Sequence, residues 1–294
     1  MKTDIYEQIT AKIITQLEQG VRPWMLPWSA GHPAGTISRP LRCNGQPYNG
    51  INILMLWGCA MERGYAAPIW MTFKQAQDLG GHVRKGEKGS MVVYANSMTR
   101  TETNEKGEDE ERSIPFLKGY TVFNVEQIKG LPAHFIAPLA APLEESARDA
   151  KAEGFFRNLG ADIRYGGSSA FYAIAPDYIQ MPAFATFRDR EAFYGTLAHE
   201  CTHWTMHEKR LARDLGGKRF GDEGYAMEEL VAELGAAFLC ADLGLEPEVR
   251  EDHAGYIESW LKVLKSDNRA IFTAASKASE AATWLIEKGN GGAA

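Results

Sequence analysis

The sequence predicts an α+β fold with two domains, a small α+β domain in front and a mostly helical domain with a small sheet behind. Helical and strand patterns alternate before residue 130, whereas helical patterns dominate after residue 143. A segment rich in proline and alanine, 131–143, separates the two regions. We therefore expect domains at 1–130 and 144–294, joined by a linker at 131–143.

The elements of the front domain follow from local patterns. Apolar residues at helical spacing predict a first helix that Gly20 ends, and Thr72 is a good N-cap for a later one. The polar segment 96–113 is expected to be a mobile hairpin tip. The expected elements are helices at 4–19, 49–63 and 72–79 and strands at 90–95 and 118–125. In the back domain we expect helices at 143–159, 188–209, 227–243, 249–264 and 270–288.

Charge is distributed unevenly along the 294 residues, whose formal net charge is −6. Residues 1–130 hold 15 Lys or Arg against 13 Asp or Glu, and six of those acids lie between Glu102 and Glu111. Without that window the front half carries a balance of +7, whereas residues 131–294 carry −8. The front half is therefore suited to a polyanionic partner, and the back half is not.

Composition argues for a globular protein, with 45% hydrophobic and 24% charged residues. No run approaches the roughly 18 apolar residues that a membrane helix needs, and the first residues lack the apolar core of a signal peptide. The cysteines form no C-x-x-C pair, which favours free thiols in a reducing compartment. They are Cys43, Cys59, Cys201 and Cys240. We expect a cytoplasmic protein with no membrane partner.

His199-Glu200-x-x-His203 is the motif that carries chemistry. Helix positions four apart lie one above the other, so the two imidazoles can hold one metal ion. Glu200 can reach the open side of that ion and act as the general base of catalysis. Because three fixed residues in five also occur by chance, the motif needs support from elsewhere in the chain.

A third ligand is available one helix downstream. A zinc peptidase site takes three protein ligands and leaves one position for water. Glu229 and Glu233 are four residues apart in an apolar segment, where carboxylates are rare unless paired or bound to metal. We expect Glu229 to bind the metal and Glu233 to accept a proton from the free nitrogen of a metal-binding histidine. In the alternative, Glu228 and Glu229 merely open the helix as solvated acids, which leaves Glu233 unexplained.

Residues 169–182, ahead of the motif helix, are predicted to form two short strands around a Pro-Asp turn. Peptidases with this motif commonly align the substrate along an edge strand, since backbone pairing accepts many sequences. We therefore expect a substrate strand at Phe171, Tyr172 and Ala173, with an ordinary covering hairpin as the alternative. The candidates for a donor to the oxyanion are Tyr225, His253 and Tyr256.

Five ordered segments of the front half stand out beside the motif of the back half. They are 22–28, 48–54, 70–76, 83–89 and 120–127. Together with His199-Glu200-Cys-Thr-His203 they resemble the ArdC-type antirestriction proteins of conjugative plasmids. The resemblance implies a front domain that binds single-stranded DNA, as in TraC primases. It also implies a zincin-like metallopeptidase domain similar to SprT and ImmA-type proteases. ImmA-type chains carry asparagine or aspartate where Glu233 stands, so this chain departs from that pattern.

The resemblance makes basic and aromatic residues of the front half candidates for DNA contact. The turn at 84–89 is the strongest of them, because glycines let backbone amides approach a phosphate. Aromatic faces stack on bases with little sequence preference, although most aromatic residues in strands and helices belong to the core. The candidates are Arg39, Arg42, Tyr48, Trp70, Phe73, Lys74, Arg84, Lys85, Lys88 and Phe123.

Two functions of different classes stay open. In the first, the back domain is a zinc metallopeptidase that cleaves a host protein, with manganese as the alternative metal. It is joined to a front domain that binds single-stranded DNA. In the second, the chain coats incoming single-stranded plasmid DNA without catalysis and keeps the metal domain only as a scaffold. The antirestriction role of the resembled family fits both.

Overall fold

The computed structural model describes residues 4–24, 39–103, 109–135, 145–187, 189–216, 223–245 and 254–291. It confirms the α+β class, with helices in both halves and only small sheets. The helices are α1 (Ile5–Glu18), α3 (Ile51–Arg63), α4 (Phe73–Asp78), α5 (Glu145–Asn158), α6 (Arg190–Trp204), α7 (Glu223–Leu243), α8 (Ala254–Ser266) and α9 (Ala270–Gly289). The strands are β1 (Leu41–Arg42), β2 (Ile69–Thr72), β3 (His82–Val83), β4 (Ser90–Thr103), β5 (Asp109–Asn124), β6 (Ile128–Lys129), β7 (Asp162–Tyr165), β8 (Phe171–Ala173) and β9 (Tyr178–Met181).

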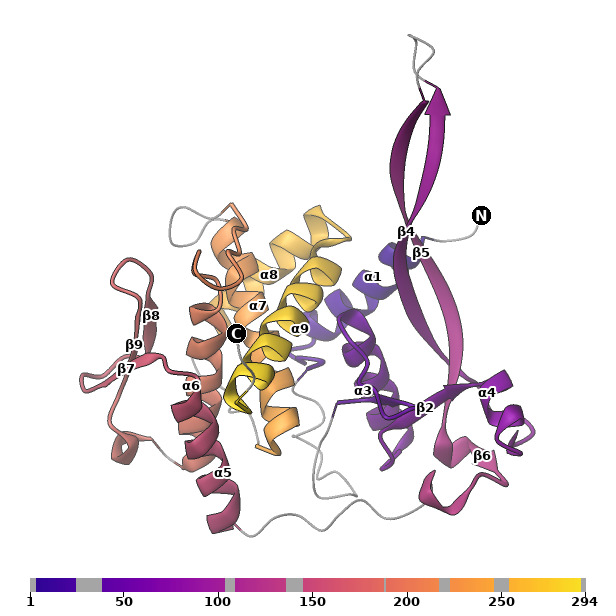
Figure 1. Cartoon of the computed structure of the whole chain (residues 1–294), viewed down its shortest axis with the longest axis horizontal. Helices are drawn as coiled ribbons and strands as arrows, with labels where there is room; N and C mark the ends of the chain where they lie inside the picture. Colours follow the sequence, from indigo (N-terminus) through magenta and orange to yellow (C-terminus); the bar gives the residue numbers. More distant parts are fainter. Residues whose placement is uncertain are drawn as a thin grey trace.

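The front sheet has the strand order β1-β2-β5-β4. β4 and β5 pair antiparallel from Ser90↔Val122 to Thr103↔Asp109 and project from the molecule as an arm (Figure 1). The expected hairpin tip at 96–113 is therefore wrong for residues 96–103 and 109–113. Strand pairing satisfies backbone hydrogen bonds whatever the polarity of the side chains, so the polar composition did not end the strands.

The predicted N-cap of α4 is confirmed. Thr72 Oγ1 accepts a hydrogen bond from Gln75 N at 3.2 Å, and Gln75 Oε1 accepts one from Thr72 N at 2.8 Å. This reciprocal pair satisfies two backbone donors that the first helical turn leaves free. It fixes the point where β2 passes into the helix.

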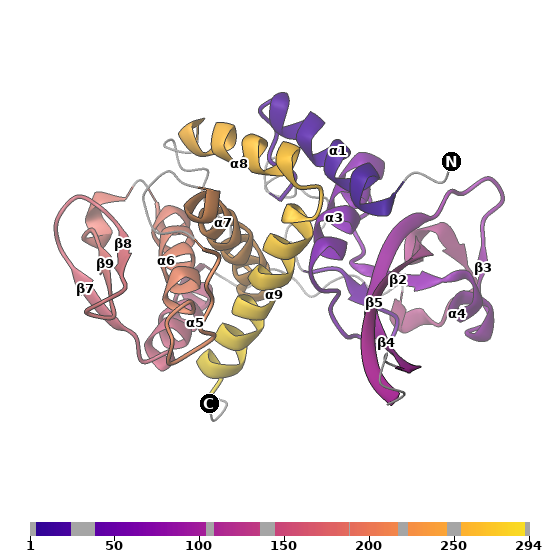
Figure 2. The same ribbon diagram turned by 90° about the horizontal axis from the view of Figure 1, so that it is seen from above.

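One hydrophobic core spans the two halves of the chain. Ile13 of α1 and Trp57 of α3 belong to the same buried cluster as Phe238 of α7, and the rings of Trp57 and Phe238 are 5.8 Å apart. In Figure 2, α1 lies beside α8, and α3 lies beside α9. The division at 131–143 stays a prediction about the sequence. Of that segment, residues 131–135 are described, and 136–143 lie outside the described residues.

The back half is built on the pair α6 and α7, with α9 packed against α7 (Figure 1). Gly235 lets the pair come close, since a Cβ at this position would lie 2.5 Å from Thr202 Cγ2 on α6. Beside α6 stands a sheet of order β7-β9-β8, in which β8 is an edge strand. No helix in the described ranges is both long and apolar enough to span a lipid bilayer.

Candidate metal centre

The two motif histidines lie one turn apart on α6. The helix is N-capped by Asp189, whose carboxylate accepts a hydrogen bond from Ala192 N at 2.8 Å. It ends at Trp204, five residues before the expected end. His199 and His203 are largely buried, and their Nε2 atoms are 3.2 Å apart. Both rings therefore present a nitrogen to the same point.

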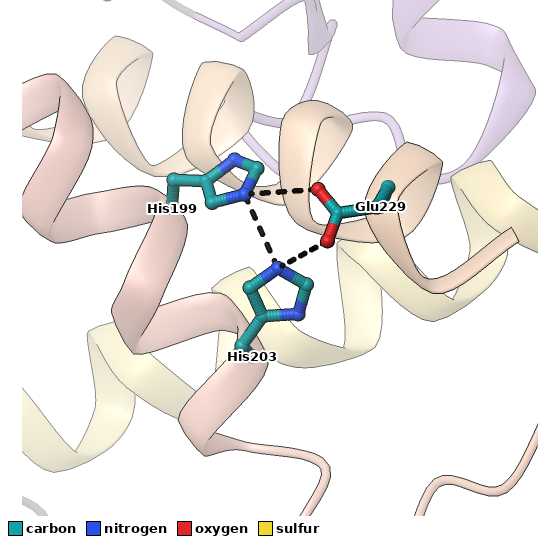
Figure 3. A group of neighbouring side chains, drawn as sticks. All are labelled: His199, His203 and Glu229. Atoms are coloured by element: carbon teal, nitrogen blue, oxygen red, sulfur yellow. Dashed lines mark hydrogen bonds and ion pairs between the residues drawn. The ribbon is translucent and has the colours of Figure 1, made fainter. Parts of the chain in front are cut away.

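Glu229 of α7 faces that point from the opposite side (Figure 3). Its two carboxylate oxygens lie 3.6 Å from His199 Nε2 and 3.5 Å from His203 Nε2. One donor atom from each of the three residues falls within 4.8 Å of the others. Two imidazoles and a carboxylate are the donor set of several catalytic zinc sites, so these residues fit a divalent metal ion.

His203 is held from behind by Glu228. Glu228 Oε1 lies 3.1 Å from His203 Nδ1, and Arg213 donates to both oxygens of Glu228, at 2.8 and 2.6 Å. Burial alone would raise the pKa of Glu228, but hydrogen bonds from Arg213 and His203 outweigh it and hold the pKa below its ordinary value. Glu228 is thus a buried carboxylate that orients a histidine ring. It is not the solvated first-turn acid of the alternative interpretation.

The same contacts fix the charge of the pair His203 and Glu229. Burial alone would lower the pKa of His203, yet the hydrogen bond with Glu228 and the nearby Glu229 carboxylate outweigh it and raise that pKa to about 10. The pKa of Glu229 is far below its ordinary value, because its interactions with the imidazoles of His199 and His203 outweigh burial. The cluster thus combines anionic carboxylates with a cationic imidazole, and a metal ion has to displace that proton.

Glu233 lies one turn beyond Glu229, behind His199. Its Oε2 is 3.9 Å from His199 Nδ1, too long for a hydrogen bond. Among the described residues, His199 Nδ1 is a buried nitrogen without a hydrogen-bond partner. Glu233 Oε1 instead accepts from Arg22 Nη1 at 3.0 Å and from Trp24 Nε1 at 3.2 Å. The front half of the chain therefore supplies two residues directly behind the site.

Glu200 follows His199 on α6 and is buried, with 3% of its surface exposed.

Two of the candidate oxyanion donors are close to each other, since the hydroxyls of Tyr225 and Tyr256 are 3.2 Å apart. Burial, with Tyr256 and Glu229 as neighbours, raises the pKa of Tyr225. Tyr225 therefore keeps its phenolic proton at neutral pH. The third candidate, His253, lies outside the described residues.

The predicted substrate strand coincides with β8, which pairs antiparallel with β9 around the Pro-Asp turn. Arg210, six residues beyond α6, ties this hairpin to the helix. It donates to Asp177 at 2.5 Å and to the Tyr172 hydroxyl at 3.1 Å, and its guanidinium lies 4.1 Å from the centre of the Trp204 ring. The edge strand is therefore held in a fixed position relative to the helix that carries both histidines.

Three candidates for DNA contact are buried, which corrects that part of the expectation. Trp70 is 1% exposed and Tyr48 7%, in a core cluster under α3. Arg39 is 6% exposed and forms a bidentate ion pair with Asp242 of α7, at 2.6 and 2.5 Å. An aromatic ring in a core offers no face to a base, and a buried, paired guanidinium does not reach a phosphate.

The remaining basic candidates are exposed, at Arg42, Lys74, Arg84, Lys85 and Lys88. Arg84 is paired with Glu87, at 2.9 and 2.6 Å, which reduces the net charge of the turn at 84–89. Phe73 is 49% exposed, and Phe123 is partly buried against another core cluster. These five basic residues of the front half are therefore open to solvent, and three of them share the turn at 84–89.

Sequence reasoning missed the residues behind the metal ligands. Arg213, Arg22 and Trp24 stand far from the motif in the chain, so no local spacing connects them with it. Glu228 had a signal, since the apolar residues on both sides of Glu228-Glu229 predict burial for that stretch as a whole. Which of two consecutive carboxylates faces the metal depends on how α6 and α7 pack.

Comparison with known proteins divides the chain into two matched regions. Residues 3–123 match the family described as the N-terminal domain of anti-restriction factor ArdC. Residues 150–277 match the family of zincin-like metallopeptidases. Both histidines and Glu229 fall in the second region, and the β4–β5 arm lies almost entirely in the first.

Several relatives match over nearly the whole chain. The uncharacterized protein y4eC of Sinorhizobium fredii is 47% identical over 288 residues, which cover 96% of this chain and 92% of the relative. A DNA primase TraC of Escherichia coli is 37% identical over 302 residues, covering 97% of this chain but only 27% of the primase. This chain therefore spans about a quarter of that primase.

Two crystal structures of the antirestriction protein ArdC from plasmid R388 are similar over their full length. The metal-free form is 44% identical with a TM-score of 0.81, and the alignment covers 99% of this chain and 100% of the other. The Mn(II)-bound form is 44% identical with a TM-score of 0.80, covering 98% of this chain and 99% of the other.

Proposed function

Because the chain belongs to the ArdC antirestriction family, we propose that it protects incoming conjugative DNA from host restriction by binding it as a single strand. We further propose that its back half is a metal-dependent peptidase that acts on a host protein in the cytoplasm. The convergence of His199, His203 and Glu229 on one point carries the peptidase proposal. The balance of +7 outside the acidic window and the DNA-primase relatives support DNA binding.

The donor set supports zinc as the metal, with manganese as the alternative. Two histidines and one glutamate, with a fourth position for water, are typical of catalytic zinc. Imidazole and carboxylate also suit manganese, and a relative has been crystallised with Mn(II). When bound, the metal polarises a scissile carbonyl and lowers the pKa of its water toward about 7.

The chain's own residues would then move protons and hold the substrate. Glu200 accepts a proton from the attacking water and passes it to the leaving amine. Tyr225, whose raised pKa keeps it protonated, donates a hydrogen bond to the developing oxyanion. β8 pairs with the substrate backbone along its free edge. Glu228 and Arg213 hold His203 in one orientation.

A panel with Glu200→Gln tests whether the centre is catalytic. Glu208→Gln is the matched control, because Glu208 is an exposed carboxylate just beyond the same helix. Each protein is assayed for cleavage of host extract with and without single-stranded DNA, for DNA affinity and for protection of transferred plasmid. We expect Glu200→Gln to lose all cleavage, to bind DNA as the wild type does, and to keep part of the protection.

The second candidate is a protein that only coats DNA. It is supported by the exposed basic residues of the front half, because coating DNA requires no residue of the metal centre. Absence of cleavage by the wild type under all conditions, with full protection in Glu200→Gln, would support this candidate and contradict the peptidase. Loss of all protection in Glu200→Gln with unchanged DNA affinity would instead make cleavage of a host protein the function.

A further inference from the structure

The β4–β5 arm carries three aromatic residues with large exposed faces. Tyr94 on β4 is 49% exposed, and Phe116 and Tyr120 on β5 are 36% and 40% exposed. Tyr94 stands opposite Lys118 in the strand register, so Phe116 and Tyr120 are its diagonal neighbours on the same face of the pair. The centre of the Tyr94 ring lies 6.3 Å from that of Phe116 and 6.4 Å from that of Tyr120.

Burial changes along this face of the arm. Nearer the body of the protein, Val92 and Val122 occupy it and are 6% and 2% exposed, packed in a core cluster with Leu56 of α3. Farther along the same face, in the described part of the chain, the aromatic cluster stays exposed. Single exposed apolar residues are ordinary, but a contiguous group of large rings indicates an interaction surface.

Polar groups of this surface suit an anionic partner with flat rings. Lys118 Nζ lies 5.1 Å from the centre of the Tyr120 ring. Asn96 Nδ2 donates to the Tyr94 hydroxyl at 2.6 Å, which fixes that ring. Rings interleaved with cations are how proteins bind single strands without sequence preference.

We propose that Tyr94, Phe116 and Tyr120 form a stacking platform for the bases of single-stranded DNA, with Lys118 neutralising a backbone phosphate. The proposal rests on the single-strand binding proposed above and assigns it to the arm. None of these four residues was among the candidates that the sequence suggested.

Leucine substitutions in the full-length protein test the platform. Leucine keeps a large apolar side chain but has no π-face, so Tyr94→Leu, Phe116→Leu and Tyr120→Leu separate base stacking from general apolar contact. Phe184→Leu is the control, since Phe184 is 46% exposed but lies in the back half. Thermal unfolding of each variant verifies its fold. Affinity for a fluorescent oligothymidine and for a duplex is measured by anisotropy over a range of salt.

We expect each platform variant to bind the single strand about 5- to 100-fold more weakly, with the control unchanged. Lys118→Gln should reduce the slope of log affinity against log salt by about one phosphate contact, whereas Lys129→Gln, an exposed lysine on β6, should not. If the wild type does not bind single strands, the proposed DNA function fails, and the platform with it.

If the wild type binds and the folded triple leucine variant binds equally well, only the platform is overturned. A triple variant that loses plasmid protection while keeping its DNA affinity would show that the surface serves a protein partner, which also overturns the proposal.

Discussion

Gly235→Ala tests how the approach of α7 to α6 builds the metal centre. The added Cβ would lie 2.5 Å from Thr202 Cγ2 and 2.9 Å from Thr202 Oγ1. Thr202 is fully buried, and its hydroxyl donates to Ala198 O at 2.8 Å. Its branched side chain is therefore stiff and has no free space to enter. The helices have to separate, and Glu229, six residues before Gly235 on α7, moves away from the histidines.

The magnitude follows from two opposing terms. Overpacking a rigid core costs about 3 kcal/mol here, the upper part of the usual range, because the contact is far inside van der Waals distance. Alanine gains about 1 kcal/mol over glycine in a helix interior. The net loss in unfolding free energy is about 2 kcal/mol. Gly154→Ala in α5 is the control, because its Cβ would meet nothing within 4 Å, and it should gain up to about 1 kcal/mol.

Urea unfolding in the presence of a chelator measures the stability of the fold, and calorimetric titration measures metal affinity. We expect Gly235→Ala to lose both stability and affinity. The double variant Gly235→Ala/Thr202→Ala removes the two nearest atoms, Thr202 Cγ2 and Oγ1, and leaves Thr202 Cβ at 3.3 Å, so it should recover most of each loss. Wild-type stability and affinity in Gly235→Ala would refute the close-packing account.

Three further predictions concern the surroundings of the site. Glu229→Gln should abolish stoichiometric metal binding, and Glu228→Gln should weaken it about 10- to 100-fold. Glu223→Gln, at an exposed position of α7, should have no effect in the same titration. Equal effects at Glu228 and Glu229 would contradict the ligand assignment. Arg210→Ala should accelerate amide exchange in the β8–β9 hairpin, because it removes the contacts to Asp177 and Tyr172; unchanged exchange would exclude the tether. Arg22→Met should destabilise the whole chain by about 3 kcal/mol in urea, since it takes a buried cation away from Glu233, and a wild-type midpoint would show that this pair contributes little.

Local signals predicted the elements that position the site. The caps and apolar spacing of the front helices act within one or two turns, and the structure has these helices within two residues of the expected bounds. The spacing of His199 and His203 on one helix needs no tertiary information either. The length of the arm was missed, because a polar composition lowers strand propensity without preventing the pairing of β4 and β5.

Other features depend on partners that are distant in the chain. Arg39 looked like a surface cation, but its partner Asp242 lies 203 residues away. Glu228 and Glu229 are neighbours in sequence and point toward different atoms of the site, since consecutive helix residues are turned by about 100°. Which of them meets the histidine Nε2 atoms is decided by the packing of α6 on α7. Trp70 was expected to contact bases because its local sequence does not predict its burial under α3.

An anomalous difference map from crystals grown with zinc, or with manganese, tests the central claim most directly. We expect one strong peak per chain, about 2.0–2.2 Å from His199 Nε2, His203 Nε2 and a carboxylate oxygen of Glu229. A fully loaded crystal without a peak there, or with Glu228 or Glu233 in place of Glu229 as the ligand, would contradict it.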